Sequence, residues 1–81
     1  MTSIGLLLEL DHRIDEMRGR IHVQHERIIQ MELEGRDPSD AFDILADLER
    51  SLRDAIRQRD QVSRDLEHKR RWAHASARIV K

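Results

Sequence analysis

The stretch Glu34-Gly35-Arg36-Asp37-Pro38-Ser39-Asp40 interrupts a chain that otherwise has the residue spacing of long helices. Gly35 lacks a Cβ atom and can therefore adopt the left-handed conformation that ends a helix. Asp37 is suited to cap the next helix with its side-chain oxygen, and Pro38 fits the first helical position because its missing N–H costs nothing there. A stop, a cap and a start so close together predict a short turn at residues 35–37 between two antiparallel helices.

The segment before this turn is predicted to be a helix over roughly residues 3–34. Its apolar residues recur at spacings of three and four, which is the pattern of a coiled-coil seam. The two rows of the seam are Leu7, Ile14, Ile21 and Ile28, and Leu10, Met17, Gln24 and Met31. Gln24 is the polar member. Either it specifies register or partner from inside the seam, or it lies at the seam edge and reaches water, and we expect the second.

The segment after the turn is predicted to be a helix over roughly residues 38–76. Its seam residues are Ala41, Leu45, Leu48, Leu52, Ala55, Arg59, Val62, Leu66, Lys69 and Ala73. Folding the chain at residue 36 pairs Ile28 with Leu45, Ile21 with Leu52, Met17 with Ala55, and Leu7 with Leu66. Arg59 would then lie near Ile14. Because a long arginine side chain can reach out of a seam to a carboxylate, we expect it to contact Asp11 or Asp15.

Length and composition favour a single small all-α domain. The chain has 81 residues, of which 38% are charged and 2% are aromatic, and this charge content is too high for a thick globular core. The absence of cysteine excludes disulfides and thiolate chemistry. The short apolar run in residues 1–10 has neither a basic lead nor a small-residue cleavage site, and no apolar run approaches the length of a membrane span. We therefore expect a cytoplasmic protein.

Apolar residues outside the seams predict a partner. Those near the turn are Ile29, Leu33, Phe42 and Ile44, and those near the other end are Ile4, Leu6, Leu8, Trp72, Ile79 and Val80. A lone hairpin would expose them as patches larger than soluble monomers usually carry, whereas two hairpins packed as a four-helix bundle would cover them. We therefore predict a coiled-coil-like hairpin that forms a homodimer, although a helical protein partner would satisfy the same requirement. The predicted interface residues are Ile29, Leu33, Phe42, Ile44, Leu8 and Trp72.

Charge is distributed unevenly along the chain. Residues 1–68 contain 10 Lys and Arg against 16 Asp and Glu, a net charge of −6, whereas residues 69–81 contain 5 basic and no acidic residues, a net charge of +5. The basic residues of this C-terminal stretch are Lys69, Arg70, Arg71, Arg78 and Lys81. With Trp72 they are suited to contact nucleic-acid phosphates and stack on a base, or to meet an acidic membrane or protein surface. The simplest interpretation is that they keep the end of the helix soluble.

No pattern in the sequence indicates catalysis. His22, His25 and Glu26 come closest to a metal-ligand cluster, but they occupy one exposed helix face, without the second set of ligands that a stable site needs. Paired carboxylates such as Asp15 and Glu16 have no predicted cavity around them in which to act as acid and base. The sequence has no glycine-rich phosphate loop and no nucleophile elbow. We therefore predict a non-enzymatic protein with no metal, no cofactor and no small-molecule substrate.

Residues 21–59 resemble a group of small proteobacterial proteins of unknown function. The resemblance rests on Glu32-Leu33-Glu34-Gly35-Arg36-Asp37 followed by Ala41, Leu45, Leu48 and Leu52. It implies a bacterial hairpin of two helices joined by a short turn, and no particular activity. The predicted architecture is also similar to that of Rop, a dimer of helical hairpins that binds RNA. This similarity is architectural only, because the RNA-contacting residues of Rop cannot be placed on this sequence.

These observations lead to two functional hypotheses. The first is a self-associating interaction or scaffold module that uses its apolar helix faces. The alternative is a nucleic-acid-binding regulator that uses the basic C-terminal stretch.

Overall fold

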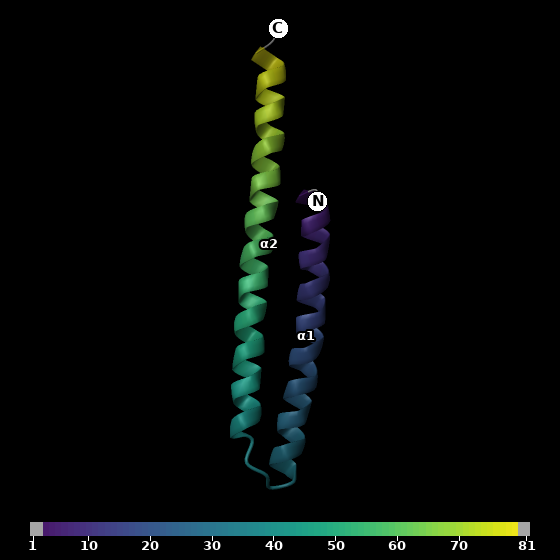
Figure 1. Ribbon diagram of the computed structural model, residues 1–81, viewed down its shortest axis with the longest axis vertical. Coiled ribbons are helices and arrows are strands. Elements are labelled where there is room, and N and C mark those ends of the chain that lie inside the picture. Colours follow the sequence, from purple (N-terminus) through teal and green to yellow (C-terminus); the bar gives the residue numbers. More distant parts are fainter. Residues whose placement is uncertain (1–2, 80–81) are drawn as a thin grey trace.

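The computed structural model describes the backbone of residues 3–79 and the side chains of residues 3–73, and it consists of two long helices that pack side by side (Figure 1). Helix α1 spans Ser3–Leu33 and helix α2 spans Ser39–Ile79. The helices run antiparallel in a rod of 73 × 17 × 16 Å, and α2 extends well past the start of α1. The predicted all-helical hairpin is confirmed. Neither helix, over the residues described, is long and apolar enough to cross a membrane.

Gly35 ends α1 in the way that the sequence predicts. Its φ angle is +72°, in the left-handed region that side chains with a Cβ atom seldom adopt. The N–H of Arg36 donates to the carbonyl of Met31 at 2.9 Å, and the N–H of Gly35 donates to the carbonyl of Glu32 at 3.1 Å. This pair of bonds is the Schellman motif, and it satisfies carbonyls that the end of α1 would otherwise leave free.

Asp37 caps α2. Its Oδ1 accepts hydrogen bonds from the Ser39 backbone N–H at 3.0 Å and from the Ser39 hydroxyl at 2.6 Å. Pro38 follows the cap, and its carbonyl accepts the N–H of Phe42 at 2.9 Å. The two bonds from Ser39 lower the pKa of Asp37. The ionised cap therefore stabilises the fold above the ordinary carboxyl pKa of about 3.9, and this contribution is lost as the pH falls through the lowered pKa.

The two predicted seams meet and form the core. All of the α1 seam positions are buried or half-buried, and the α2 seam is likewise covered from Ala41 to Leu66. The most buried apolar side chains are Leu10, Ile14, Ile28, Ala41, Leu45 and Ala55. The spacing also places Lys69 and Ala73 in the seam. Both are exposed because α1, which begins at Ser3, does not reach far enough to cover them.

Gln24 corrects one expectation. It is only 7% exposed, so the interpretation of a seam-edge side chain reaching water is wrong. Its Nε2 donates to the backbone carbonyl of Ala41 at 2.8 Å, across the two helices. The alanine side chain is small enough to leave this carbonyl within reach, and the hydrogen bond offsets the cost of burying the amide.

We expect substitution by alanine to have opposite effects on stability at Gly35, in the turn, and at Gly19, in the middle of α1. Gly35→Ala should lower the free energy of unfolding by about 1–2 kcal/mol, because alanine is strained at a positive φ angle. Gly19 is helical and exposed, and a Cβ atom there would meet no neighbouring group within 4 Å. Gly19→Ala should therefore raise the free energy of unfolding by up to about 1 kcal/mol. Urea denaturation followed by circular dichroism measures both changes, and equal changes in the two variants would contradict this account of the turn.

Gln24→Glu tests the buried hydrogen bond with a side chain of nearly the same shape. An ionised carboxylate facing the Ala41 carbonyl should lower the free energy of unfolding by at least about 2 kcal/mol at pH 7. Burial should raise the pKa of the new carboxyl, so the loss relative to the parent chain should shrink as the pH falls toward about 4.3. Gln58→Glu at an exposed position is the matched control and should change stability by less than about 0.5 kcal/mol. A Gln24→Glu variant as stable as this control would show that the amide is solvated.

Candidate protein-interaction surfaces

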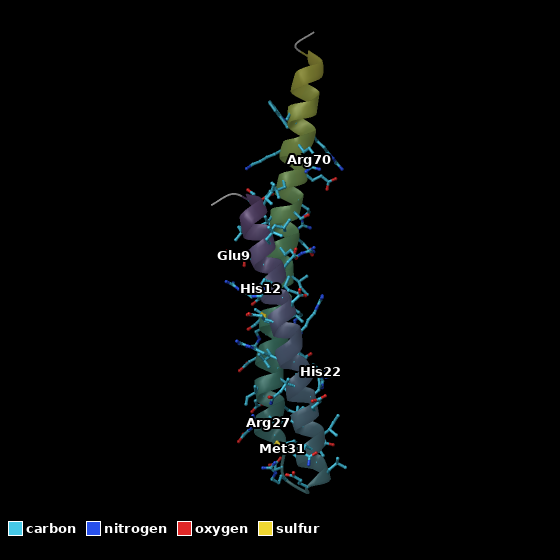
Figure 2. The ribbon with its side chains drawn as sticks, turned by 90° about the vertical axis from the view of Figure 1, so that its right-hand side faces the viewer. Glu9, His12, His22, Arg27, Met31 and Arg70 are labelled. Carbon is cyan, nitrogen blue, oxygen red and sulfur yellow. The ribbon has the colours of Figure 1, made fainter. Side chains whose placement is uncertain are left out.

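The hairpin has two long sides on which both helices are accessible. We call one side the Asp15 flank, and its groove is lined by Asp11, Asp15, Arg18 and Ile56. The groove on the other side, the Arg20 flank, is lined by Glu16, Gly19, Arg20, Val23, Gln24 and Leu48. In Figure 2, Glu9 and Arg27 lie on the left side of α1 and His22 lies on the right side. Arg27 follows Arg20 by one heptad and His22 follows Asp15 by one heptad, so the left side is the Arg20 flank and the right side is the Asp15 flank.

Large apolar side chains remain exposed outside the seam. They are between 47% and 77% exposed, and in the described part of the chain they are Ile4, Leu8, Val23, Ile29, Leu33, Phe42, Ile44 and Trp72. Helix periodicity places Ile4, Leu8 and Ile29 in line with the residues of the Asp15 flank. Leu33 follows Ile29 by one turn and, at 77% exposed, lies at the outer edge of this flank, farthest from the seam. Phe42 precedes Ile56, which lines the Asp15 groove, by two heptads, so it projects from the start of α2 on the same side. The Asp15 flank therefore carries more of the exposed large apolar side chains than the Arg20 flank does.

The predicted interface residues do not all share one surface. Leu8, Ile29, Leu33 and Phe42 belong to the Asp15 flank, whereas Ile44 lies on the Arg20 flank and Trp72 lies beyond the end of α1. All six are exposed, so each is available to a partner. Sequence reasoning missed Val23, which lines the groove of the Arg20 flank. Its signal was an aliphatic residue in an otherwise polar row.

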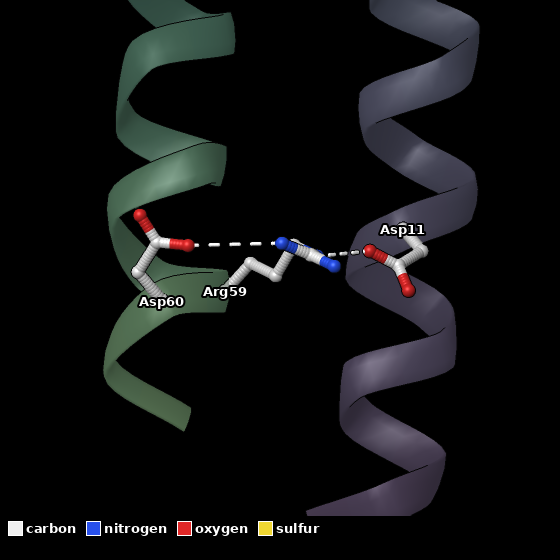
Figure 3. Close-up of polar contacts among 3 residues, drawn as sticks. All are labelled: Asp11, Arg59 and Asp60. Carbon is white, nitrogen blue, oxygen red and sulfur yellow. Dashed lines mark hydrogen bonds and ion pairs between the residues drawn. The ribbon is translucent and has the colours of Figure 1, made fainter. Parts of the chain in front are cut away.

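Arg59 contacts the carboxylate that its place in the seam predicts. Its guanidinium donates from Nε to Asp11 Oδ1 on the facing helix, and its Nη1 lies 3.7 Å from Asp60 of its own helix (Figure 3). The side chains of Arg59 and Asp11 are both 43% exposed, so water screens this pair and limits its contribution to stability to about 1 kcal/mol. Arg59 leaves the seam toward the Asp15 flank and makes that flank polar at mid-length.

The basic stretch begins where α1 stops covering α2. Lys69 shares a groove with Ser3, the first described residue of α1, so residues 70–79 form an overhang about 15 Å long. Lys69, Arg70, Arg71 and Trp72 are exposed, and Arg71 also pairs with Glu67 at 3.1 Å. The side chains of Arg78 and Lys81, which complete the predicted basic surface, lie outside the described residues.

The turn end of the hairpin is acidic. Residues 32–43 contain five carboxylates and one arginine, a net charge of −4, and the carboxylates belong to Glu32, Glu34, Asp37, Asp40 and Asp43. Glu34 accepts a hydrogen bond from Gln30 at 2.9 Å and pairs with Arg36 at 2.8 Å, and these contacts lower the pKa of Glu34. The acidic turn end carries Leu33 and Phe42, and the basic overhang carries Trp72, so each end combines charge with exposed apolar area.

Two histidines of α1 pair with a glutamate one turn further along the helix. His22 Nε2 lies 3.0 Å from Glu26, and His12 Nε2 lies 3.1 Å from Glu16, each one turn along α1. Over the residues described, no group of three or more histidine, aspartate or glutamate side chains is arranged to hold a metal ion. His22, His25 and Glu26 therefore do not form a ligand cluster here.

No family model, curated protein or solved structure matches the chain. The resemblance drawn from the turn residues stays a prediction.

Proposed function

We propose that this chain is a non-enzymatic interaction or scaffold module that associates with a second copy of itself through an apolar helix face. The observation that carries the proposal is the set of exposed apolar residues on the Asp15 flank, Ile4, Leu8, Ile29, Leu33 and Phe42. Water must order around these side chains in a lone hairpin, and burying them against similar side chains releases that cost. Two hairpins packed face to face would provide such a surface.

Sedimentation equilibrium over a wide range of concentrations, with circular dichroism on the same samples, tests the proposal. We expect a strongly helical dimer. Ile29→Lys combined with Phe42→Lys should shift the chain to monomers, because both substitutions place charge on the Asp15 flank. The seam residues are untouched, so helicity at high concentration should persist.

The matched control is Val23→Lys, which removes an equally exposed aliphatic residue from the Arg20 flank and should leave the dimer intact. A parent chain that stays monomeric up to millimolar concentration would overturn the proposal.

A second candidate function is nucleic-acid binding by the basic C-terminal stretch, favoured by the exposure of Lys69, Arg70, Arg71 and Trp72 together. The replacement of Lys69, Arg70 and Arg71 by alanine should then weaken binding to a fluorescent single-stranded RNA. The affinity of the parent chain should fall steeply with added salt, because each phosphate contact releases counterions. Equal millimolar affinity of the parent and substituted chains, at every salt concentration, would eliminate this candidate.

A further inference from the structure

The exposed apolar residues of α1 are placed symmetrically along the helix. Ile4 and Leu33 lie at equal distances on either side of the midpoint between Arg18 and Gly19, and so do Leu8 and Ile29. Two such helices laid antiparallel about this midpoint would bring Leu8 against Ile29 and place Ile4 level with Leu33, twice over. A self-complementary surface of this kind is what a two-fold symmetric dimer requires.

The same midpoint relates the charged ends of the hairpin. Ile28 packs against Leu45, and Leu7 shares a groove with Leu66, so the midpoint of α1 is level with the middle of the Asp54–Ala55 step of α2. A half-turn about this level places Lys69 of one copy level with Asp40 of the other. Arg70 and Arg71 then lie beside the acidic turn end of the second copy, which has a net charge of −4 over residues 32–43.

We propose that a second copy docks antiparallel on the Asp15 flank, with the overhang of each copy seated against the turn end of the other. This inference rests on the self-association proposed above and adds its face, its direction and a role for the basic stretch. In a parallel arrangement, both turns would lie at the same end of the dimer. The two acidic turn ends would then be side by side, and so would the two basic overhangs. Electrostatics disfavours that alternative.

Within the Asp15 flank, two places along the dimer bring like charges close to the same level. Arg18 of each copy lies near the two-fold axis, where Asp15 of each copy, one turn away, balances the two guanidinium groups. On α2, Glu49 lies at the same level as Asp60 of the second copy. Arg53, one turn from Glu49, balances these carboxylates. These positions are at mid-length, between the apolar contacts at the two ends.

Pulsed electron paramagnetic resonance on a spin label tests the direction of the dimer. The chain has no cysteine, so Arg36→Cys provides a single labelling site in the turn. The antiparallel arrangement predicts a distance of about 53 Å between the two labels, from twice the rise of the residues between position 36 and the midpoint. A distance of roughly 10–20 Å, one or two helix diameters, would place both turns at the same end and overturn the proposal.

Disulfide cross-linking tests the face. Arg18→Cys places a thiol near the two-fold axis on the Asp15 flank and should give a covalent dimer on mild oxidation. Arg20→Cys, its matched control on the Arg20 flank, should stay uncross-linked under the same conditions. If only the Arg20→Cys variant forms a cross-link, the contact lies on the Arg20 flank and the proposal is overturned.

Charge reversal tests the contact between overhang and turn end. One variant carries Lys69→Glu, Arg70→Glu and Arg71→Glu, and the other carries Asp40→Lys and Asp43→Lys with the Asp37 cap kept. Each alone should self-associate on the order of tenfold more weakly, and an equimolar mixture should form a heterodimer with near-parental affinity. Circular dichroism confirms that each variant keeps its helices.

The results separate this inference from the proposed function. A parent chain that is monomeric at all concentrations would overturn both. A stable dimer with a short distance between turn labels, or a mixture that forms no heterodimer, would leave self-association standing and overturn the antiparallel docking alone.

Discussion

The structure depends on one backbone constraint, the left-handed conformation of Gly35. The Schellman bonds fix where α1 ends, and the Asp37 cap fixes where α2 begins, so few residues are left to span the gap. That short connection sets the register of the hairpin, that is, which residue of α1 lies opposite which residue of α2. The seam contacts, the ion pair of Arg59 with Asp11 and the length of the overhang all follow from this register.

The turn and the seams could be predicted from the sequence because each rests on local chemistry or on simple periodicity. Gly35, Asp37 and Pro38 each favour a particular backbone position, and the spacing of Ile and Leu fixes one face of each helix. The Arg59 contact followed from the level of the turn. Burial of Gln24 could not be predicted in this way, because it depends on the small side chain of Ala41 on the opposite helix.

The candidate interaction surface was predicted less completely. The sequence identified apolar residues outside the seam, and the structure places all six predicted interface residues at the surface. Their division between two flanks depends on how each helix is rotated about its axis, and it became clear only when α1 and α2 were paired. Ile44 and Phe42 are two residues apart in sequence, yet the rotation of α2 directs them to opposite sides.

The turn also has a consequence for the order in which the hairpin assembles. Ile28, Ala41 and Leu45 form the buried cluster nearest to Gly35, and they are also the core residues separated by the shortest stretch of chain. Closing a short loop costs less conformational entropy than closing a long one. We therefore expect the helices to pair from the turn outward, and the end of the hairpin around Leu7 and Leu66 to pair last and open first.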